Sequence, residues 1–250
     1  MVSAGLHRRG IAAGEGDARL EFPVNPGEVW AVGSHLLVCD DIEAGSAERL
    51  RELAGPPDVI WTDPPWSSAQ ARMYRTVARA DGPKGRAVQW SALAQAMVEA
   101  WSHCPGDVWA QLGTREGHTA AECDAVIETV KAAGGQHLWT SETIILEAPS
   151  SMLLFRWTPR ERETLPTGRF DCYQAPSLCL EASDVGPGDV VTDFCFGAAA
   201  VGPLAAVGRG ARFVGAELSP GRMAMALRRM ATLTDEQPRH VSPRQARAIA

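Results

Sequence analysis

The fold of this chain is indicated most clearly by one stretch, DVVTDFCFGAAAVGPLAAV, which covers residues 189–207. It opens with an apolar run of the kind found in buried strands and passes through small residues into a helical pattern. Small residues in a strand-to-helix turn let the backbone approach a ligand closely. We therefore predict a parallel α/β unit whose turn, from Asp193 to Gly197, faces a ligand.

A second strand follows about twenty residues further on and ends in an acid, since residues 213–217 read FVGAE. A carboxylate in this position can accept hydrogen bonds from ribose hydroxyls, so Glu217 is the candidate ribose ligand. The same acid can also belong to a helix start, because Ser219 suits the N-cap and Pro220 the first helical position. The two interpretations are compatible.

The rest of the chain repeats this alternation, which is typical of a mostly parallel sheet covered on both faces. The predicted strands are His35–Cys39, Asp58–Thr62, Asp107–Leu112, Thr143–Glu147, Met152–Trp157, Asp189–Asp193 and Arg212–Glu217. The predicted helices are Ala87–Ser102, Ala120–Ala133, Ser177–Ala182, Ala198–Val207 and Pro220–Leu233. No helix separates the strands around Ala148–Ser150, so they should pair as an antiparallel hairpin. The expected fold class is α/β, a doubly wound Rossmann-like sheet of seven strands with a terminal antiparallel hairpin.

The chain length of 250 residues suits one substantial domain. We expect a single domain over residues 21–236, flanked by loose tails at 1–20 and 237–250, where no apolar period is visible. No run approaches the ~18 apolar residues that span a bilayer, and the first residues lack a signal pattern. A cytoplasmic protein is therefore expected.

Charge and cysteine usage limit the partners. The six cysteines are scattered without the close pairs of a zinc site, so we expect reduced thiols and no metal. The net charge of −6 argues mildly against a protein that grips duplex DNA. Two basic clusters allow either a solvated face or contact with a polyanion. They are Arg72, Arg75, Arg79, Lys84 and Arg86, and Arg156, Arg160, Arg162 and Arg169.

The tetrapeptide Asp63-Pro64-Pro65-Trp66 directly follows the predicted strand Asp58–Thr62. Ligands of open α/β sheets bind beyond the carboxyl ends of strands. An exocyclic amine on a base is a poor nucleophile, because its lone pair is delocalised into the ring. Asp63 and the Pro64 carbonyl could accept its two N–H groups and free that lone pair, while Trp66 stacks on the base. The alternative is an ordinary turn with an aromatic residue packed into the core.

These pieces, in this order, resemble the permuted β-class DNA amino-methyltransferases, a family that includes enzymes found beside ParB-like nuclease domains and in phages. The resemblance spans about residues 26 to 233. It is carried by Gly27–Trp30, His35–Asp41, Asp63–Trp66, Tyr173–Pro176, Asp193–Ala200 and Glu217–Pro220. In that family the catalytic tetrapeptide precedes the cofactor loop, as it does here.

The resemblance implies S-adenosyl-L-methionine as cofactor and a nucleic-acid substrate, with DNA favoured over RNA. It gives catalytic and base-stacking positions to Asp63, Pro64, Pro65 and Trp66. A tryptophan at the fourth position is more usual among N6-adenine enzymes, which favours adenine N6 over cytosine N4. The implied cofactor-binding residues are Asp41, Asp63, Gln174, Pro176, Asp193, Phe194, Cys195, Phe196, Gly197, Glu217 and Leu218.

The cofactor loop departs from the family pattern Asp-Pro-Phe-x-Gly-x-Gly. Phe194 replaces the proline, Cys195 the phenylalanine and Ala199 the second glycine, while Ala175 replaces a lysine of the segment that wraps the methionine end. If the glycine position needs a positive φ, alanine is strained there. We expect weaker or altered cofactor binding on this account.

The family usually inserts a recognition domain after the hairpin, where only about residues 158–171 are available here. Residues 67–89 are the other candidate to cover a target. Three hypotheses follow, in this order: an adenine-N6 DNA methyltransferase; an amino-methyltransferase acting on RNA, a nucleotide or a small aromatic amine; and a catalytically silent subunit. A homodimer is left open. All three require the Asp63 turn and the Gly197 bend to lie side by side.

Overall fold

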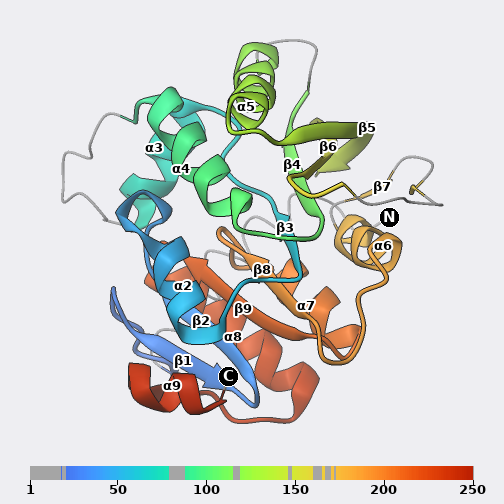
Figure 1. Ribbon diagram of the computed structural model, residues 1–250. Helices are drawn as coiled ribbons and strands as arrows, with labels where there is room; N and C mark the ends of the chain where they lie inside the picture. Colours follow the sequence, from blue (N-terminus) through green and yellow to red (C-terminus); the bar gives the residue numbers. More distant parts are fainter. Residues whose placement is uncertain are drawn as a thin grey trace.

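The computed structural model describes residue 18 and residues 21–78, 88–114, 119–145, 148–159, 165–166, 170–171 and 173–249. Within them, ten strands form one sheet in the order β10-β1-β2-β9-β8-β3-β4-β6-β5-β7 (Figure 1). The strands are β1 (Val29–Val32), β2 (His35–Cys39), β3 (Val59–Thr62), β4 (Val108–Gly113), β5 (Gln136–Ile145), β6 (Ala148–Arg156), β7 (Phe170–Asp171), β8 (Val190–Asp193), β9 (Arg212–Glu217) and β10 (Arg239–Val241).

Helices cover both faces of the sheet (Figure 1). They are η1 (Ile42–Ala44), α2 (Ser46–Ala54), α3 (Ser68–Ala78), α4 (Trp90–Ser102), α5 (Ala120–Ala132), α6 (Gln174–Ala182), α7 (Val201–Gly208), α8 (Pro220–Thr234) and α9 (Pro243–Ile249). One hydrophobic core lies under α6, α7 and α8 and contains Trp61 and Trp109. The other lies under α2, α4, α5 and α9 and contains Ile60 and Leu153. The doubly wound α/β fold predicted from the sequence is confirmed.

The centre of the sheet is parallel. Strand β2 pairs with β9, β9 with β8, β8 with β3 and β3 with β4, each in parallel register. The carboxyl ends of these five strands therefore meet on one side of the sheet, which we call the carboxyl edge, and their amino ends meet on the opposite, amino edge. Ligands of such sheets bind beyond the carboxyl edge.

Each of the seven predicted strands is present, but the predicted number is wrong, because the described residues hold three more. Strands β7 and β10 have only two and three residues, so a periodic pattern could not develop in them. Strand β1 was missed although its four buried apolar residues make it as long as β3 and β8. The antiparallel hairpin is confirmed as β5–β6, although β6 already begins at Ala148. It is not terminal, because β7 pairs with β5 outside it.

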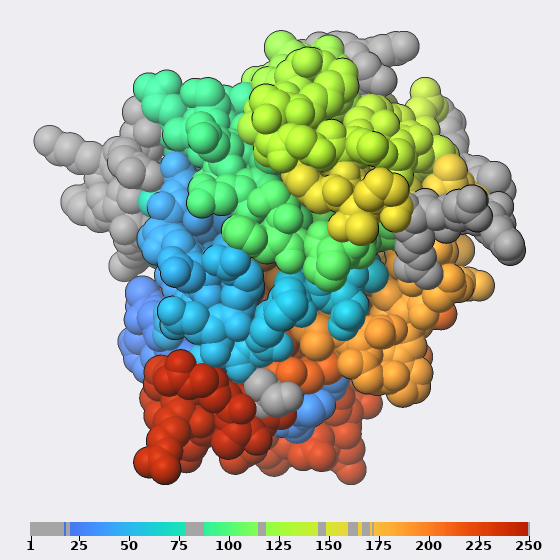
Figure 2. Space-filling view, viewed as in Figure 1, coloured from blue at the N-terminus to red at the C-terminus, as the bar shows by residue number. Residues whose placement is uncertain are grey.

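The C-terminal segment is not a loose tail, and this expectation is wrong. Strand β10 pairs with β1, and α9 follows it, with Val241 and Ala246 buried. Figure 2 shows this segment against the rest of the molecule, beside α2. Seven helical residues with one buried position give no readable period. The predicted N-terminal tail lies outside the described residues, except for Ala18, which is buried.

The five predicted helices are present with adjusted ends, and α2, α3, η1 and α9 are additional. Helix α7 starts at Val201 instead of Ala198, because Gly197–Ala199 form a turn. Helix α8 begins as the sequence predicts. The Ser219 hydroxyl accepts the Arg222 N–H at 3.4 Å, and Pro220 occupies the first turn.

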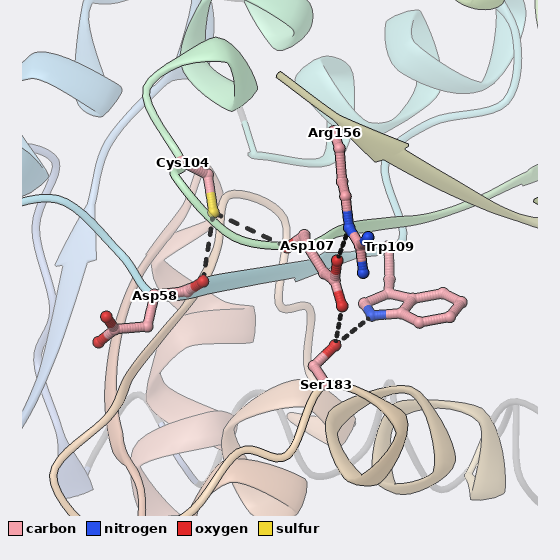
Figure 3. Close-up of polar contacts among 6 residues, drawn as sticks. All are labelled: Asp58, Cys104, Asp107, Trp109, Arg156 and Ser183. Atoms are coloured by element: carbon pink, nitrogen blue, oxygen red, sulfur yellow. Dashed lines mark hydrogen bonds and ion pairs between the residues drawn. The ribbon is translucent and has the colours of Figure 1, made fainter. Parts of the chain in front are cut away.

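A buried polar network fixes α6 at the amino edge (Figure 3). Asp107, which precedes β4, forms an ion pair with Arg156 and accepts the Ser183 hydroxyl at 2.6 Å. The Trp109 indole donates to the same Ser183 oxygen at 2.8 Å. Because Ser183 is the C-cap of α6, this nine-residue helix ends at the amino edge, and along its length it packs against β3 and β7. Its first turn lies about 13 Å away, toward the carboxyl edge.

Candidate active site

Four acids stand at the carboxyl ends of four neighbouring strands. Asp41 follows β2, Glu217 ends β9, Asp193 ends β8 and Asp63 follows β3. Since β8 and β3 are parallel neighbours, the tetrapeptide turn and the small-residue bend lie side by side. This is the arrangement that the sequence-based hypotheses require.

Hydrogen bonds define the shape of the Asp63–Trp66 turn. The Trp66 indole donates to Asp63 Oδ1 at 3.0 Å, and the Trp66 backbone N–H donates to Gln70 Oε1. Gln70 in turn contacts the Tyr74 hydroxyl at 3.3 Å, so two side chains of α3 support the turn. Trp66 is partly exposed and belongs to neither hydrophobic core. Trp66 is therefore not a core residue, and its indole is available to line the site.

The electrostatics of Asp63 suit a proton acceptor. Burial raises the pKa of Asp63 to about 7, while the Trp66 hydrogen bond and the positive charge of Arg222 oppose that rise. The Arg222 guanidinium stacks on Tyr74, with its Cζ atom 4.3 Å from the ring centroid. Burial also raises the pKa of Tyr74. A carboxyl group with a pKa near neutrality can take up and release a proton at physiological pH.

Asp193 is fully buried at the end of β8. Its Oδ1 atom accepts the Cys195 backbone N–H at 2.9 Å, whereas Oδ2 makes no hydrogen bond of standard geometry in the described part of the chain, although the Thr62 hydroxyl is near enough to interact with the carboxyl group. Burial raises the pKa of Asp193 to about 8. Hydrogen bonds from the Cys195 N–H and the Thr62 hydroxyl oppose this rise, and the neighbouring acids Asp63 and Glu217 add to it. A Cβ atom at Gly202 would lie 3.0 Å from Oδ2, so this glycine leaves room beside the carboxyl group. A buried carboxyl oxygen of this kind suits a positively charged ligand.

Glu217 holds the cofactor loop against the end of β9. Its Oε2 atom accepts the Gly197 N–H at 2.9 Å, and its Oε1 atom accepts the Ser219 N–H at 2.8 Å. The acid therefore joins the bend after β8 to the start of α8. The helix-start interpretation made from the sequence fits the contact with Ser219, and the assignment of Glu217 as the ribose ligand stays a prediction.

The conformation of the loop resolves the question raised by its missing glycine. Gly197 has a φ of +61°, but Ala199 does not have a positive φ, so alanine is unstrained there. The strain sits at Ala200 instead, with a φ of +53°, and costs about 1–2 kcal/mol. Phe194 and Phe196 are buried in the two cores, while Cys195 is partly exposed. The phenylalanine side chains thus hold the loop in place, and its backbone faces the edge.

Asp41 lies at the far side of the same edge, but its carboxylate has other partners. It accepts the Glu43 N–H at 3.0 Å and forms a 2.6 Å ion pair with Arg75, which also reaches Glu43 at 2.9 Å. Arg75 comes from α3, so this helix crosses from the β3 turn to the β2 turn.

Some residues of the two basic clusters form ion pairs inside the protein. Arg75 and Arg156 are buried in ion pairs, which corrects both interpretations of these residues as surface cations. Arg72 is exposed on α3. The remaining members, Arg79, Lys84, Arg86, Arg160, Arg162 and Arg169, lie outside the described residues, as does much of the two segments expected to cover a target.

The first turn of α6 contributes Gln174 and Pro176. Gln174 is exposed and Pro176 buried, and the Asp171 carboxylate accepts the N–H groups of Tyr173 and Gln174 at 2.9 and 2.8 Å. Helix α6 also packs against β3. Its first turn lies on the carboxyl-edge side, which is compatible with the wrapping role that the resemblance implies.

Sequence reasoning missed the residues that α3 and α8 bring to the site: Gln70, Tyr74 and Arg222. A signal was present for two of them, because Gln70 and Tyr74 follow Trp66 at four-residue intervals, the spacing of one helix face. Nothing in the sequence pairs Arg222 with Tyr74. In the described ranges no group of three or more His, Cys, Asp or Glu side chains could hold a metal ion, and no helix there could cross a bilayer.

Comparison with solved structures shows that this chain shares its fold with DNA methyltransferases. The PvuII DNA methyltransferase (cytosine-N4-specific) superposes with a TM-score of 0.56 at 12% identity, covering 90% of this chain and 95% of its own. M1.HpyAVI in its SAM complex gives 0.53 at 11% identity, covering 76% and 96%. TTHA0409 from Thermus thermophilus, a candidate DNA modification methylase, gives 0.50 at 18%, covering 74% and 92%. No protein-family model and no curated protein matches the sequence.

Proposed function

We propose that the protein transfers a methyl group from S-adenosyl-L-methionine to an exocyclic amino nitrogen of a nucleic-acid base, with adenine N6 in DNA as the favoured target. One observation carries the proposal: the Asp63–Trp66 turn and the Asp193–Gly197 bend end adjacent parallel strands. A donor held by the bend is then within reach of an amine held by the turn. The fold shared with the PvuII enzyme supports the same class of reaction.

The residues of the carboxyl edge fit the cofactor. When bound, S-adenosyl-L-methionine supplies an electrophilic methyl group on a positively charged sulfur and also carries an ammonium group. Asp193 and Asp63 would supply the negative charge that these cations need, because a bound cation lowers the raised pKa values of both carboxyl groups and favours their ionised forms. Glu217 would hold the ribose hydroxyls, as the sequence suggests, and the Gly197 bend would allow the backbone to approach closely.

The Asp63 turn would prepare the amine. The Trp66 indole occupies Asp63 Oδ1, so we assign Oδ2 and the Pro64 carbonyl as acceptors for the two amine hydrogens. The indole ring, supported by Gln70 through the Trp66 backbone, would stack on the base. As the nitrogen gains its methyl group it becomes acidic, and Asp63, with a pKa of about 7, can take the released proton.

The second candidate is an amino-methyltransferase that acts on RNA or on a small aromatic amine. The charge of the protein supports it. The net charge is −6, and Arg75 and Arg156 are used in buried ion pairs. Salt separates the two candidates, because duplex binding weakens steeply as salt rises and binding of a small amine does not. A steep slope of affinity against salt for DNA supports the first candidate, and a flat one supports a small substrate.

The decisive experiment measures methylated nucleosides by mass spectrometry in DNA and RNA from cells that express the chain or its Asp63→Asn variant. We expect N6-methyladenine in DNA only with intact Asp63, with a rate loss of at least about 100-fold in the variant. Asp58→Asn is the matched control, because Asp58 is an exposed acid at the amino edge, just before β3.

Other outcomes overturn parts of the proposal. Methylcytosine in place of methyladenine would reject adenine as the target and keep the reaction. If calorimetry detects no binding of S-adenosyl-L-methionine and no methylated nucleoside forms, the chain is a silent subunit with a methyltransferase fold.

A further inference from the structure

Three uncharged polar side chains form a buried cluster on the side of the sheet beyond the catalytic turn. Gln111 on β4 donates through Nε2 to Thr143 Oγ1 at 3.1 Å and to Ser150 Oγ at 3.2 Å. The two hydroxyls, on β5 and β6, lie 2.7 Å apart. All three residues are at most 1% exposed. We call them the amide–hydroxyl cluster.

The hydrogen bonds within the cluster do not use all of its donors and acceptors. In the described chain, Gln111 Oε1 has no hydrogen-bond partner. One of the two hydroxyls donates to the other, which leaves the second hydroxyl hydrogen without an acceptor there. An unpaired buried polar group costs about 1–3 kcal/mol, so a group of this kind in a folded protein needs an explanation. The cluster therefore presents one spare acceptor and one spare donor, a few ångströms apart.

Strand register places the cluster next to the catalytic turn. Thr62 pairs with Ala110 across β3 and β4, and the next residues on the two strands are Asp63 and Gln111. Adjacent strands lie about 4.8 Å apart. Trp61 and Trp109, two residues earlier on each strand, share one core, so Gln111 faces the same side as α6.

Within the described residues, the carboxyl edge carries acids next to four strands and buried uncharged polar groups on three others. Acids end or follow β2, β9, β8 and β3, whereas β4, β6 and β5 carry the uncharged cluster. Charged groups suit a cationic cofactor. Neutral donors and acceptors suit an uncharged heterocycle, whose recognition does not require a buried charge.

We propose that Gln111, Thr143 and Ser150 recognise the amidine edge of the substrate base, the pair formed by the reacting amine and the adjacent ring nitrogen. Gln111 Oε1 shares one amine hydrogen with the Pro64 carbonyl in a three-centre hydrogen bond, and the spare hydroxyl hydrogen donates to the ring nitrogen. Adenine and cytosine both present this pattern, whereas thymine and uracil present a carbonyl beside an N–H. The inference rests on the proposed function and adds the residues that select the base.

The test uses a thermodynamic cycle between the cluster and the ring nitrogen. The kcat/KM of methyl transfer is measured for a DNA substrate with adenine or 1-deazaadenine at the target position, for the wild type and for Thr143→Val/Ser150→Ala. 1-Deazaadenine replaces the ring nitrogen by C–H. We expect the wild type to prefer adenine. In the variant, the ratio of kcat/KM for adenine to that for 1-deazaadenine should fall about tenfold, which is the effect of one hydrogen bond. If the product is methylcytosine, 3-deazacytosine takes the place of 1-deazaadenine.

Two further variants separate recognition from folding. Ser151→Ala removes a neighbouring buried hydroxyl whose side chain alternates to the other face of β6, and it should leave the preference unchanged. Gln111→Met keeps the side-chain volume and removes the acceptor, so it should lower kcat/KM for adenine. A thermal unfolding transition should show that this variant is still folded.

An unchanged preference in an active Thr143→Val/Ser150→Ala protein, with only a loss of stability, would overturn the inference and assign the cluster to a buried water. A wild-type chain that binds the cofactor yet methylates no nucleic acid would instead overturn the proposed function, and the inference with it.

Discussion

Individual acids at the carboxyl edge occupy positions where a carboxylate is costly. Asp193 is fully buried and Asp63 partly so, and burial raises the pKa of both. The proposed cationic cofactor would account for such an arrangement, because the incoming positive charge would offset the cost. At this scale the reactivity of the site depends on single hydrogen bonds, which conservative substitutions can remove.

The Trp66→Phe substitution keeps an aromatic ring and removes the indole N–H that donates to Asp63. Because this hydrogen bond lowers the pKa of Asp63, its loss raises that pKa further. The acid limb of the pH profile of kcat/KM should move up by roughly 0.5–1 pH unit. Trp157→Phe is the control, since that indole donates to the Ala133 carbonyl, away from the site. An unshifted profile would show that the bond does not tune Asp63.

Asp193→Asn should stabilise the protein at alkaline pH. The folded-state pKa of about 8 lies above the unfolded value of about 3.9. The stability contributed by the protonated group is therefore fully present below pH ~4 and is lost as pH rises through 8. Urea unfolding at pH 5 and pH 9 should show a gain for the variant at both pH values, and the gain at pH 9 should exceed that at pH 5 by a few kcal/mol. Glu181→Gln, an exposed change, should show none, and an equal gain at both pH values would contradict the assignment.

Among the elements, α3 and α6 connect the strand ends. Helix α3 supports the catalytic turn through Gln70 and reaches the β2 turn through Arg75. Helix α6 is held at the amino edge by the network of Figure 3. The site is therefore assembled by two helices whose anchors are buried polar contacts.

Arg156→Met tests the anchor at the amino edge. It leaves the buried Asp107 charge without its ion-pair partner Arg156, so the free energy of unfolding should fall by about 3–5 kcal/mol in urea titrations. The double variant Asp107→Asn/Arg156→Met should recover part of this loss. Lys131→Met breaks the exposed pair with Glu128 and should cost no more than about 0.5 kcal/mol. Equal losses in the two single variants would show that burial does not set the strength of the pair.

For the whole molecule, the ten-stranded sheet depends on its C-terminal segment. Truncation after Gln237 removes β10 and α9, exposes the outer edge of β1 and uncovers the core around Val29. The loss of buried Val241 alone should cost about 1.5–3 kcal/mol, so the melting temperature should drop by several degrees. Arg244→Ala/Arg247→Ala changes only exposed side chains of α9 and should leave it unchanged. An unaltered melting temperature after truncation would restore the loose-tail interpretation.

Much of the fold follows from local sequence. Seven of the strands and five of the helices are visible because a buried strand is apolar over its length and the apolar residues of a half-buried helix recur every three to four positions. The Asp63–Trp66 turn and the Asp193–Gly197 bend are visible for a related reason, since prolines and glycine restrict the backbone locally. These features require no knowledge of what lies across the sheet.

The strand order, by contrast, was decided only in three dimensions. That β8 lies beside β3, that Arg75 closes on Asp41 and that Gln111 meets Thr143 and Ser150 depend on contacts between residues 32 or more positions apart. No local propensity encodes such pairings, because their free energy is gained only when the whole sheet forms. The short edge strands and α9 belong to the same group, since they are stable only against the core that they cover.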